Sequence, residues 1–210
     1  MSGWRSVRCV ACLLVIVLGF ALAGGCTSQA LRSFQREPEL PVHQLLYKQL
    51  GALPADWTLE KPDIWTDTDF TWARWAVVVN FEYKDGSDFA GEEIHIFANP
   101  FLARITRYPS PSSLSAGEGY MPQGWTYRPP HAQRFEFGCT GGDGANQPEG
   151  CSLILRYEEY VIVLSTPIAE YMTLEDLRRL LEVIDREMAD FLQHSTLRPG
   201  PRKVPESLDP

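Results

Sequence analysis

Large apolar side chains occupy every second position of the segment 75–83, and this alternation constrains the fold more than any other feature of the chain. The residues on the apolar side are Trp75, Val77, Val79, Phe81 and Tyr83. The residues on the other side include the polar Asn80 and Glu82. Successive side chains of a strand point to opposite faces, so the pattern indicates a sheet that buries one face only. Such a sheet needs a second layer to cover its apolar face.

Turn-forming residues follow this strand, and a second strand pattern resumes beyond them. Lys-Asp-Gly-Ser at 84–87 has turn chemistry, and alternation returns over 93–98, which predicts a β-hairpin with a fairly long loop. A second block of strand patterns occupies 134–139, 151–157 and 160–166. Only Glu158 and Glu159 separate the last two of these strands, so we expect them to pair through a tight turn.

A repeated hexapeptide relates the two blocks. Leu-Pro-Ala-Asp-Trp-Thr at 53–58 resembles Met-Pro-Gln-Gly-Trp-Thr at 121–126, and each copy precedes a strand-rich stretch. We therefore expect one sheet that is built from two related, hairpin-rich β-units.

Two amphipathic patterns provide the layer that covers the sheet. A short helix is expected over 42–50, where apolar residues recur at helical spacing after Pro41. A longer helix begins after Thr173, which can form a capping box with Asp176. Its apolar stripe consists of Leu177, Leu180, Leu181, Ile184, Met188, Phe191 and Leu192, while charged residues such as Asp185 are expected to face water. The predicted fold is α+β: a single domain with an antiparallel sheet of two hairpin-rich units, packed by a long C-terminal helix and a shorter N-terminal helix.

Cys139 and Cys151 lie at the two ends of a glycine-rich loop between two predicted strands. Facing residues of a hairpin come within disulfide reach, so we expect these two cysteines to form a disulfide. Two thiolates without further well-spaced ligands do not make a metal site, so neither a metal nor a cofactor is expected. The oxygen-bearing side chains of the loop, Asp143, Asn146 and Glu149, lack the spacing of an EF-hand.

The first 25 residues have the layout of a secretory signal. Two arginines precede an apolar run, and small residues follow it up to Cys26. Residues 23–26, Ala-Gly-Gly-Cys, resemble the lipobox of bacterial prolipoproteins, with alanine at the position where leucine is commonest. The resemblance implies that residues 1–25 are removed, that Cys26 is acylated, and that the N-terminal lipid binds a membrane.

Two other interpretations of this region stay open. Ala-Leu-Ala at 21–23 is a site for ordinary signal peptidase, which would release a soluble protein. The apolar run, at roughly 18 residues, is also just long enough to remain as a membrane anchor. Lipid attachment is favoured because it consumes Cys26 and leaves Cys139 and Cys151 as an even pair. The expected location is the outer face of the cytoplasmic membrane or the outer membrane.

The exported sequence divides into a tether, one domain and a tail. Residues 26–41 are polar and are expected to tether the domain 42–193, and the proline-rich segment 194–210 is expected to be a disordered tail. Residues 1–25 contain two of the 19 basic residues and none of the 27 acidic ones, so the exported part has a formal net charge of −10. This charge argues against nucleic acid as a partner, and against binding to anionic lipid by electrostatics.

Catalytic signatures are scarce. The sequence has no nucleophile-elbow, zinc-protease, β-lactamase or phosphate-binding glycine motif, and its four histidines fall in four different segments. Glu93 and His95 share a strand face and could form an acid–base pair, although a solvated sheet face is the favoured interpretation. Glu92 and Glu93 are the carboxylates that an unrecognised hydrolase could use, but their spacing does not single them out. We therefore expect no catalytic residues.

Tryptophan is unusually frequent in the expected domain. Trp75 lies on the apolar strand face and is expected in the core. Trp65 and Trp72, with Phe70, lie in a loop-like stretch and form the candidate binding face. The expected function is an envelope-tethered, non-catalytic binding or assembly module; its partner, an envelope protein or a glycan, is not identified by the sequence. The alternative is recognition of a glycan or small ligand by the tryptophan-rich face.

Overall fold

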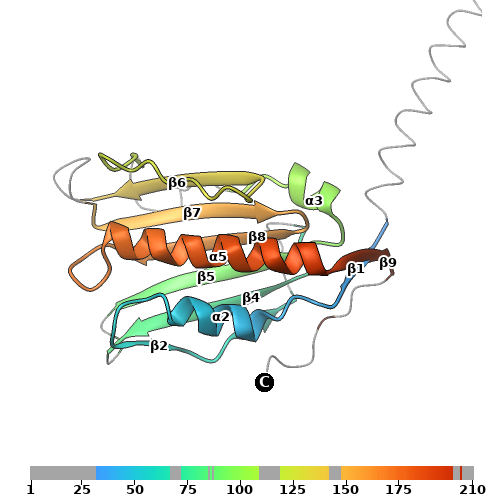
Figure 1. Ribbon diagram of the computed structural model, residues 1–210, viewed down its shortest axis with the longest axis horizontal. Helices are drawn as coiled ribbons and strands as arrows, with labels where there is room; N and C mark the ends of the chain where they lie inside the picture. The colour runs from blue at the N-terminus through green and yellow to red at the C-terminus, as the bar shows by residue number, and fades with distance from the viewer. Residues whose placement is uncertain are drawn as a thin grey trace, which may run out of the picture.

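A seven-stranded antiparallel sheet forms the centre of the protein (Figure 1). The structure is a computed structural model, and it describes residues 32–66, 72–84, 86, 88–108, 119–141, 148–200 and 204. The strands of the sheet are β2 (Trp57–Leu59), β3 (Asp63–Trp65), β4 (Trp75–Tyr83), β5 (Asp88–Ile96), β6 (Arg134–Thr140), β7 (Gly150–Tyr157) and β8 (Tyr160–Pro167). Their order is β2-β4-β5-β8-β7-β6, and β3 pairs with the other half of β4.

Two units make up this sheet. The first consists of β4 and β5 with the short strands β2 and β3 paired to β4, the second is β6–β7–β8, and the antiparallel pairing of β5 with β8 joins them. The predicted α+β domain with two hairpin-rich units is therefore confirmed. The repeated hexapeptides do not hold equivalent positions, because Trp57 begins β2 whereas Trp125 lies in the segment before β6. The β4–β5 hairpin is tighter than expected, since Tyr83 pairs with Asp88.

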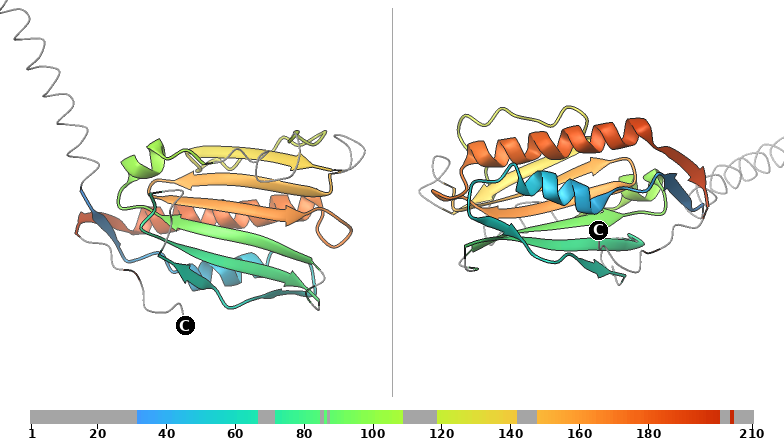
Figure 2. Two further views of the ribbon diagram at one scale, coloured as in Figure 1. Left: turned by 180° about the vertical axis from the view of Figure 1, so that it is seen from behind. Right: turned by 60° about the horizontal axis from the view of Figure 1, so that its bottom comes forward.

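Two helices cover one face of the sheet (Figure 2). The long α5 (Leu174–His194) and the shorter α2 (Val42–Leu50) lie across the face that carries the alternating apolar residues of β4. The capping box of α5 is confirmed: Asp176 N donates to Thr173 Oγ1 at 3.2 Å, and Thr173 N donates to Asp176 Oδ2 at 2.9 Å. Trp75 is buried in this core, as predicted.

The described residues cover only part of the opposite face of the sheet (Figure 2). The short helix α3 (Pro100–Ile105) lies over one end of it, where Leu102 and Ala103 pack with Ile154 and Val161. Toward the other end, Phe89 is exposed. The sheet therefore buries one face fully, which is what the period-two pattern of β4 indicates.

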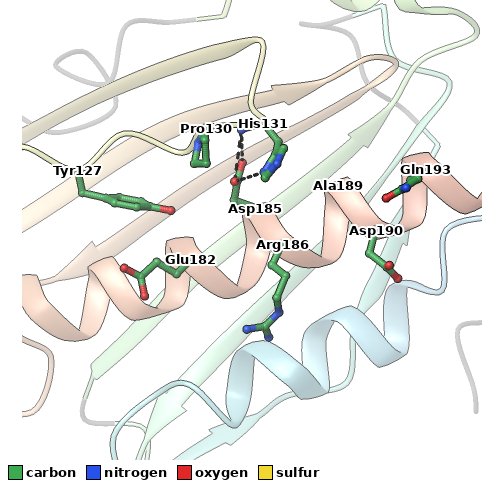
Figure 3. A pocket seen from close by; sticks show the side chains of 9 residues that line it. All are labelled: Tyr127, Pro130, His131, Glu182, Asp185, Arg186, Ala189, Asp190 and Gln193. Carbon is green, nitrogen blue, oxygen red and sulfur yellow. Dashed lines mark hydrogen bonds and ion pairs between the residues drawn. The ribbon is translucent and has the colours of Figure 1, made fainter.

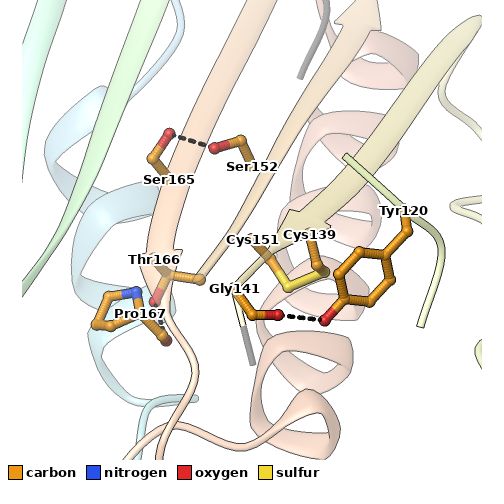
Figure 4. Close-up of a disulfide and its surroundings, with 8 residues drawn as sticks. All are labelled: Tyr120, Cys139, Gly141, Cys151, Ser152, Ser165, Thr166 and Pro167. Atoms are coloured by element: carbon orange, nitrogen blue, oxygen red, sulfur yellow. Dashed lines mark hydrogen bonds between the residues drawn. A yellow bond between two sulfur atoms is a disulfide. The ribbon is translucent and has the colours of Figure 1, made fainter. Parts of the chain in front are cut away.

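Cys139 and Cys151 form the predicted disulfide (Figure 4). They are directly opposite one another in the β6–β7 pair, with their Cα atoms 4.0 Å apart. Tyr120 packs beside the bridge, and its hydroxyl donates to the Gly141 carbonyl at 2.9 Å. In the chain-entropy model, closing a loop of this length contributes about 3 kcal/mol to the free energy of unfolding.

Both ends of the described chain are more ordered than the expected tether and tail. Within the segments 26–41 and 194–210, β1 (Phe34–Glu37) and β9 (Thr196–Pro199) pair with each other as a two-stranded ribbon. Arg36 of β1 is buried, and its guanidinium binds the buried side chain of Glu159 in the β7–β8 turn. Ordered elements therefore extend beyond the expected domain 42–193 on both sides, and no local sequence pattern signals a contact between residues this far apart. The expected lipidation residue Cys26 lies outside the described residues.

Candidate functional site

A shallow pocket of about 470 Å³ lies between α5 and the segment that precedes β6 (Figure 3). The segment before β6 contributes an aromatic ring, a proline and a histidine, and α5 contributes charged and polar side chains. The residues that line the pocket are Tyr127, Pro130, His131, Glu182, Asp185, Arg186, Ala189, Asp190 and Gln193. The pocket therefore combines an apolar floor with a rim of both charge signs.

Asp185 is the structural centre of this pocket. Its side chain is 4% exposed and accepts hydrogen bonds from the Tyr157 hydroxyl (2.9 Å to Oδ1) and from His131. His131 donates from its backbone N (3.2 Å to Oδ1) and through Nδ1, which lies 2.7 Å from Oδ2. The expectation that Asp185 faces water is wrong. It lies four residues after Leu181 and three before Met188, so helical spacing places it at the edge of the buried stripe.

Asp185 determines which ring nitrogen of His131 carries the proton, and it affects the pKa values of the two tyrosines nearby. A carboxylate acceptor at Nδ1 holds the ring proton there, which leaves Nε2 as an acceptor when the imidazole is neutral. Burial, the negative charge of Asp185 and the hydrogen bond to it raise the pKa of Tyr157 far above its usual range. Burial, together with the charges of Asp185 and Glu182, raises the pKa of Tyr127 to about 12. Both tyrosine hydroxyls are therefore protonated at neutral pH.

The pocket presents an oriented imidazole without an adjacent nucleophile. None of the side chains that line it is a serine, threonine, cysteine or lysine. The side chain of His131 is 58% exposed, so its ring meets solvent while Asp185 holds it from below. Sequence reasoning missed this pair, because His131 and Asp185 are far apart in the chain and neither belongs to a recognisable motif.

The Glu93–His95 pair that the sequence suggests lies on the face of the sheet that α5 and α2 do not cover. His95 Nε2 is 2.8 Å from Glu93 Oε2, and the His95 ring packs edge-on to Tyr108. The hydrogen bond from His95 lowers the pKa of Glu93, against the effect of its partial burial. Glu92 points into the core under α2 and is fully buried. Because Glu92 and Glu93 lie on opposite faces, they cannot act on one substrate as a carboxylate pair.

The two candidate tryptophans, Trp65 and Trp72, are exposed, unlike the tryptophans of the core. Trp65 is 52% exposed and Trp72 is 72% exposed, whereas Trp57 and Trp75 are buried. Trp65 ends β3 and Trp72 shortly precedes β4, so both lie at the connection between these two strands. Phe70, the third member of the candidate binding face, lies outside the described residues.

No family model matches this chain, and no curated protein or solved structure matches it either. In the part of the chain that the structure describes, no helix is long and apolar enough to cross a membrane. Within the same residues, no cluster of three or more His, Cys, Asp or Glu side chains is placed to hold a metal ion. Function therefore has to be inferred from the chemistry of the pocket and of the surface.

Proposed function

We propose that this protein is a lipid-anchored, non-catalytic binding module that works outside the cytoplasm and binds its ligand in the His131–Asp185 pocket. The proposal of export and anchoring rests on the signal-like segment 1–25 and on Cys26. The proposal of ligand binding rests on one observation: a buried carboxylate, Asp185, holds the exposed ring of His131 in a fixed orientation.

This arrangement costs free energy, which supports a role beyond packing. A buried carboxylate is unfavourable unless donors satisfy it, and three hydrogen bonds surround Asp185 here. Two of those bonds hold His131 in place from the rigid helix α5. Side chains that are oriented in this way before a ligand arrives lose little entropy on binding.

The composition of the pocket favours a neutral, hydroxyl-rich ligand. Tyr127 and His131 offer ring surfaces together with a hydroxyl donor and a nitrogen acceptor (Figure 3). Glu182, Asp190 and Arg186 add acceptors and donors of opposite charge around the rim. A ligand with one strong charge would meet repulsion from part of this rim, whereas sugar hydroxyls can use both signs. Envelope glycans are the ligand class with this chemistry, and an envelope protein that presents such groups is the alternative partner.

The pocket predicts a specific loss of binding in two variants. We expect His131→Ala and Asp185→Asn to weaken binding of N-acetylglucosamine oligosaccharides by about tenfold or more, because the oriented acceptor is lost. Titration calorimetry on the purified protein measures this effect. His43→Ala is the matched control, since His43 lies on α2 and contacts Tyr47 away from the pocket. Equal binding by all three variants would place the ligand elsewhere, and circular dichroism would show that each variant is folded.

The anchor predicts a defined N-terminus. Protein purified from detergent-solubilised membranes is expected to have the mass of residues 26–210 plus acyl groups, because the lipobox-like sequence directs cleavage before Cys26. Cys26→Ser is expected to abolish the lipid mass. A lipid-free chain that begins at Gly24 would instead establish a secreted protein, and an uncleaved chain would establish a signal anchor. Mass spectrometry of the intact protein separates the three results.

A further inference from the structure

The expected tether joins the fold at one end of the sheet (Figure 1). Phe34 N donates to the Ala98 carbonyl at 2.8 Å, and Asn99 Nδ2 donates to the Arg32 carbonyl at 2.7 Å. Arg74, which directly precedes β4, binds the Ser33 hydroxyl. These contacts fix residues 32–34 beside the start of β4, the end of β5 and helix α3. We call this end of the domain, from residues 32–34 across to α3 and the adjoining ends of β6 and β7, the anchor end.

Large apolar side chains are exposed at the anchor end. Trp72 is 72% exposed just before β4, and Ile105 is 48% exposed at the last position of α3. Trp65 is 52% exposed, and its strand register places it beside Ala76, the second residue of β4. Exposed tryptophan is typical of the interface between membrane and water, where the ring and its N–H meet apolar and polar groups together.

The same end carries a group of arginines, three of which have no carboxylate partner among the described residues. Arg156 near the end of β7 is directly opposite Arg134, the first residue of β6. Like charges in that position repel one another. Burial and the positive charges of Arg134 and Arg104 lower the pKa of Arg156, so the three guanidinium groups lie close together. The Nε atom of Arg156 is buried without a hydrogen-bond partner.

The two glutamates of the β7–β8 turn at this end, Glu158 and Glu159, already pair with Arg36. Arg134 pairs with Glu136, but within the described residues Arg104, Arg107 and Arg156 have no ion pair with any carboxylate. A partly exposed guanidinium without a carboxylate partner favours a phosphate or carboxylate oxygen, because its charge and its accessible N–H groups both bind anions.

Acidic residues gather at the opposite end of the sheet. Asp56 and Glu170 lie close enough to Lys84, in the β4–β5 turn, to interact with its charge. Asp88 begins β5 and interacts with Tyr171. The net charge of −10 for the exported part therefore hides a separation of charge along the strands. An anionic surface attracts the anchor end and repels the other end, although it does not attract the domain as a whole.

We propose that the anchor end docks on the surface of a bilayer that contains anionic phospholipid, with Trp72 and Ile105 at headgroup level and with Arg104, Arg107 and Arg156 binding lipid phosphates. This inference rests on the proposed lipid on Cys26 and names the surface that the anchored domain contacts. Six residues lead from Cys26 to Arg32, and six residues span at most roughly 20 Å. Acylation of Cys26 thus holds residue 32, and with it the anchor end, within that distance of the headgroups.

Brominated phospholipids test the docking, because bromine quenches only the indole rings that reach the bilayer. The lipidated protein is reconstituted into vesicles of phosphatidylcholine alone or with about a third phosphatidylglycerol. We expect quenching that is several-fold stronger in the anionic vesicles, lost in 0.5 M salt, and largely lost in Trp72→Ala. The charge reversals Arg104→Glu and Arg107→Glu together are expected to reduce the quenching to the level of neutral vesicles. Both side chains are exposed and neither forms an ion pair within the described residues; Arg104 loses only its contact with the Phe101 ring, so these variants are expected to keep the fold.

Arg128→Glu is the matched control, because Arg128 is an exposed arginine outside the anchor end. Equal quenching in neutral and anionic vesicles, or an equal loss in Arg128→Glu, overturns the docking. Flotation with the vesicles separates this result from failure of the anchor. Protein that floats with neutral vesicles has its lipid. Flotation with anionic vesicles only supports docking without an anchor, and flotation with neither kind overturns both proposals.

Discussion

Replacement of Arg36 by alanine is expected to lower the free energy of unfolding by about 3–5 kcal/mol. The Arg36 side chain is 4% exposed, and its guanidinium binds both carboxylate oxygens of Glu159 at 2.9 and 3.1 Å. It also binds Glu158 and lies 3.3 Å from Ser195 Oγ. Removal of the cation takes two hydrogen bonds and the opposite charge away from the fully buried Glu159 carboxylate, and breaking a buried ion pair by removing one partner is strongly destabilising. Urea unfolding followed by tryptophan fluorescence measures the loss.

Arg198→Ala is the matched control for this prediction. Arg198 lies on β9 in the same ribbon and pairs with Glu37 at 3.0 Å, but both side chains are largely exposed. Solvent screens that pair, so its loss is expected to cost less than about 1 kcal/mol. The double variant Arg36→Met with Glu159→Met should recover most of the stability, because it removes both charges together. Equal effects of Arg36→Ala and Arg198→Ala would show that the buried pair does not hold the ribbon.

The sequence predicts correctly those elements in which a local residue pattern is compatible with only one structure. Alternation in β4, the apolar stripe of α5 with its Thr173 cap, and the facing cysteines each specify a face or a distance within one hairpin or helix. These features depend on neighbours within a few residues or on a single turn. The sheet of two units and its covering helices follow from them, since each amphipathic surface needs an apolar partner.

The features that the sequence did not predict are buried charges whose partners are remote. Arg36 and Glu159 meet across 123 residues, and His131 and Asp185 across 54. A charged residue on its own indicates a solvated position, so the sequence alone places Arg36 in a tether and Asp185 on the outer face of α5. What keeps each of them inside is a hydrogen-bonding partner that only the folded chain brings near. The candidate site belongs to this second class, and its geometry had to come from the structure.

Glu92 is a third buried ionisable group whose partner is remote in the sequence. Because of it, we expect the free energy of unfolding to fall as the pH rises. The side chain is fully buried, and burial raises its pKa to about 7, against the effect of the hydrogen bond from Gln49. Gln49 Nε2 donates to Glu92 Oε1 at 3.1 Å, while Glu92 Oε2 and Gln49 Oε1 are buried without partners. A proton on Oε2 makes that oxygen a donor, and the Gln49 carbonyl is the acceptor beside it. The protonated acid and the amide thus satisfy one another.

The sign of the effect follows from the two pKa values of this carboxyl. The folded protein binds the proton more tightly than the unfolded chain, whose Glu92 titrates near 4.5. The stabilisation is therefore complete below about pH 4.5, is lost between about 4.5 and 7, and changes little above that range. Its total is on the order of 3 kcal/mol. We expect Glu92→Gln to remove this dependence and to be more stable than the native protein above pH 7, because glutamine keeps both hydrogen bonds without a charge.

Glu93→Gln is the matched control, because it alters the neighbouring residue on the other face of the sheet. The hydrogen bond from His95 lowers the pKa of Glu93, so its contribution has the opposite sign: it is present above the unfolded pKa and is lost as the pH falls. Glu93 is half exposed, so the effect is also smaller. Urea unfolding from pH 4.5 to 8 should show the stability difference between Glu92→Gln and the native protein growing with pH. A constant difference would mean that Glu92 is ionised in the core throughout, with a partner other than Gln49.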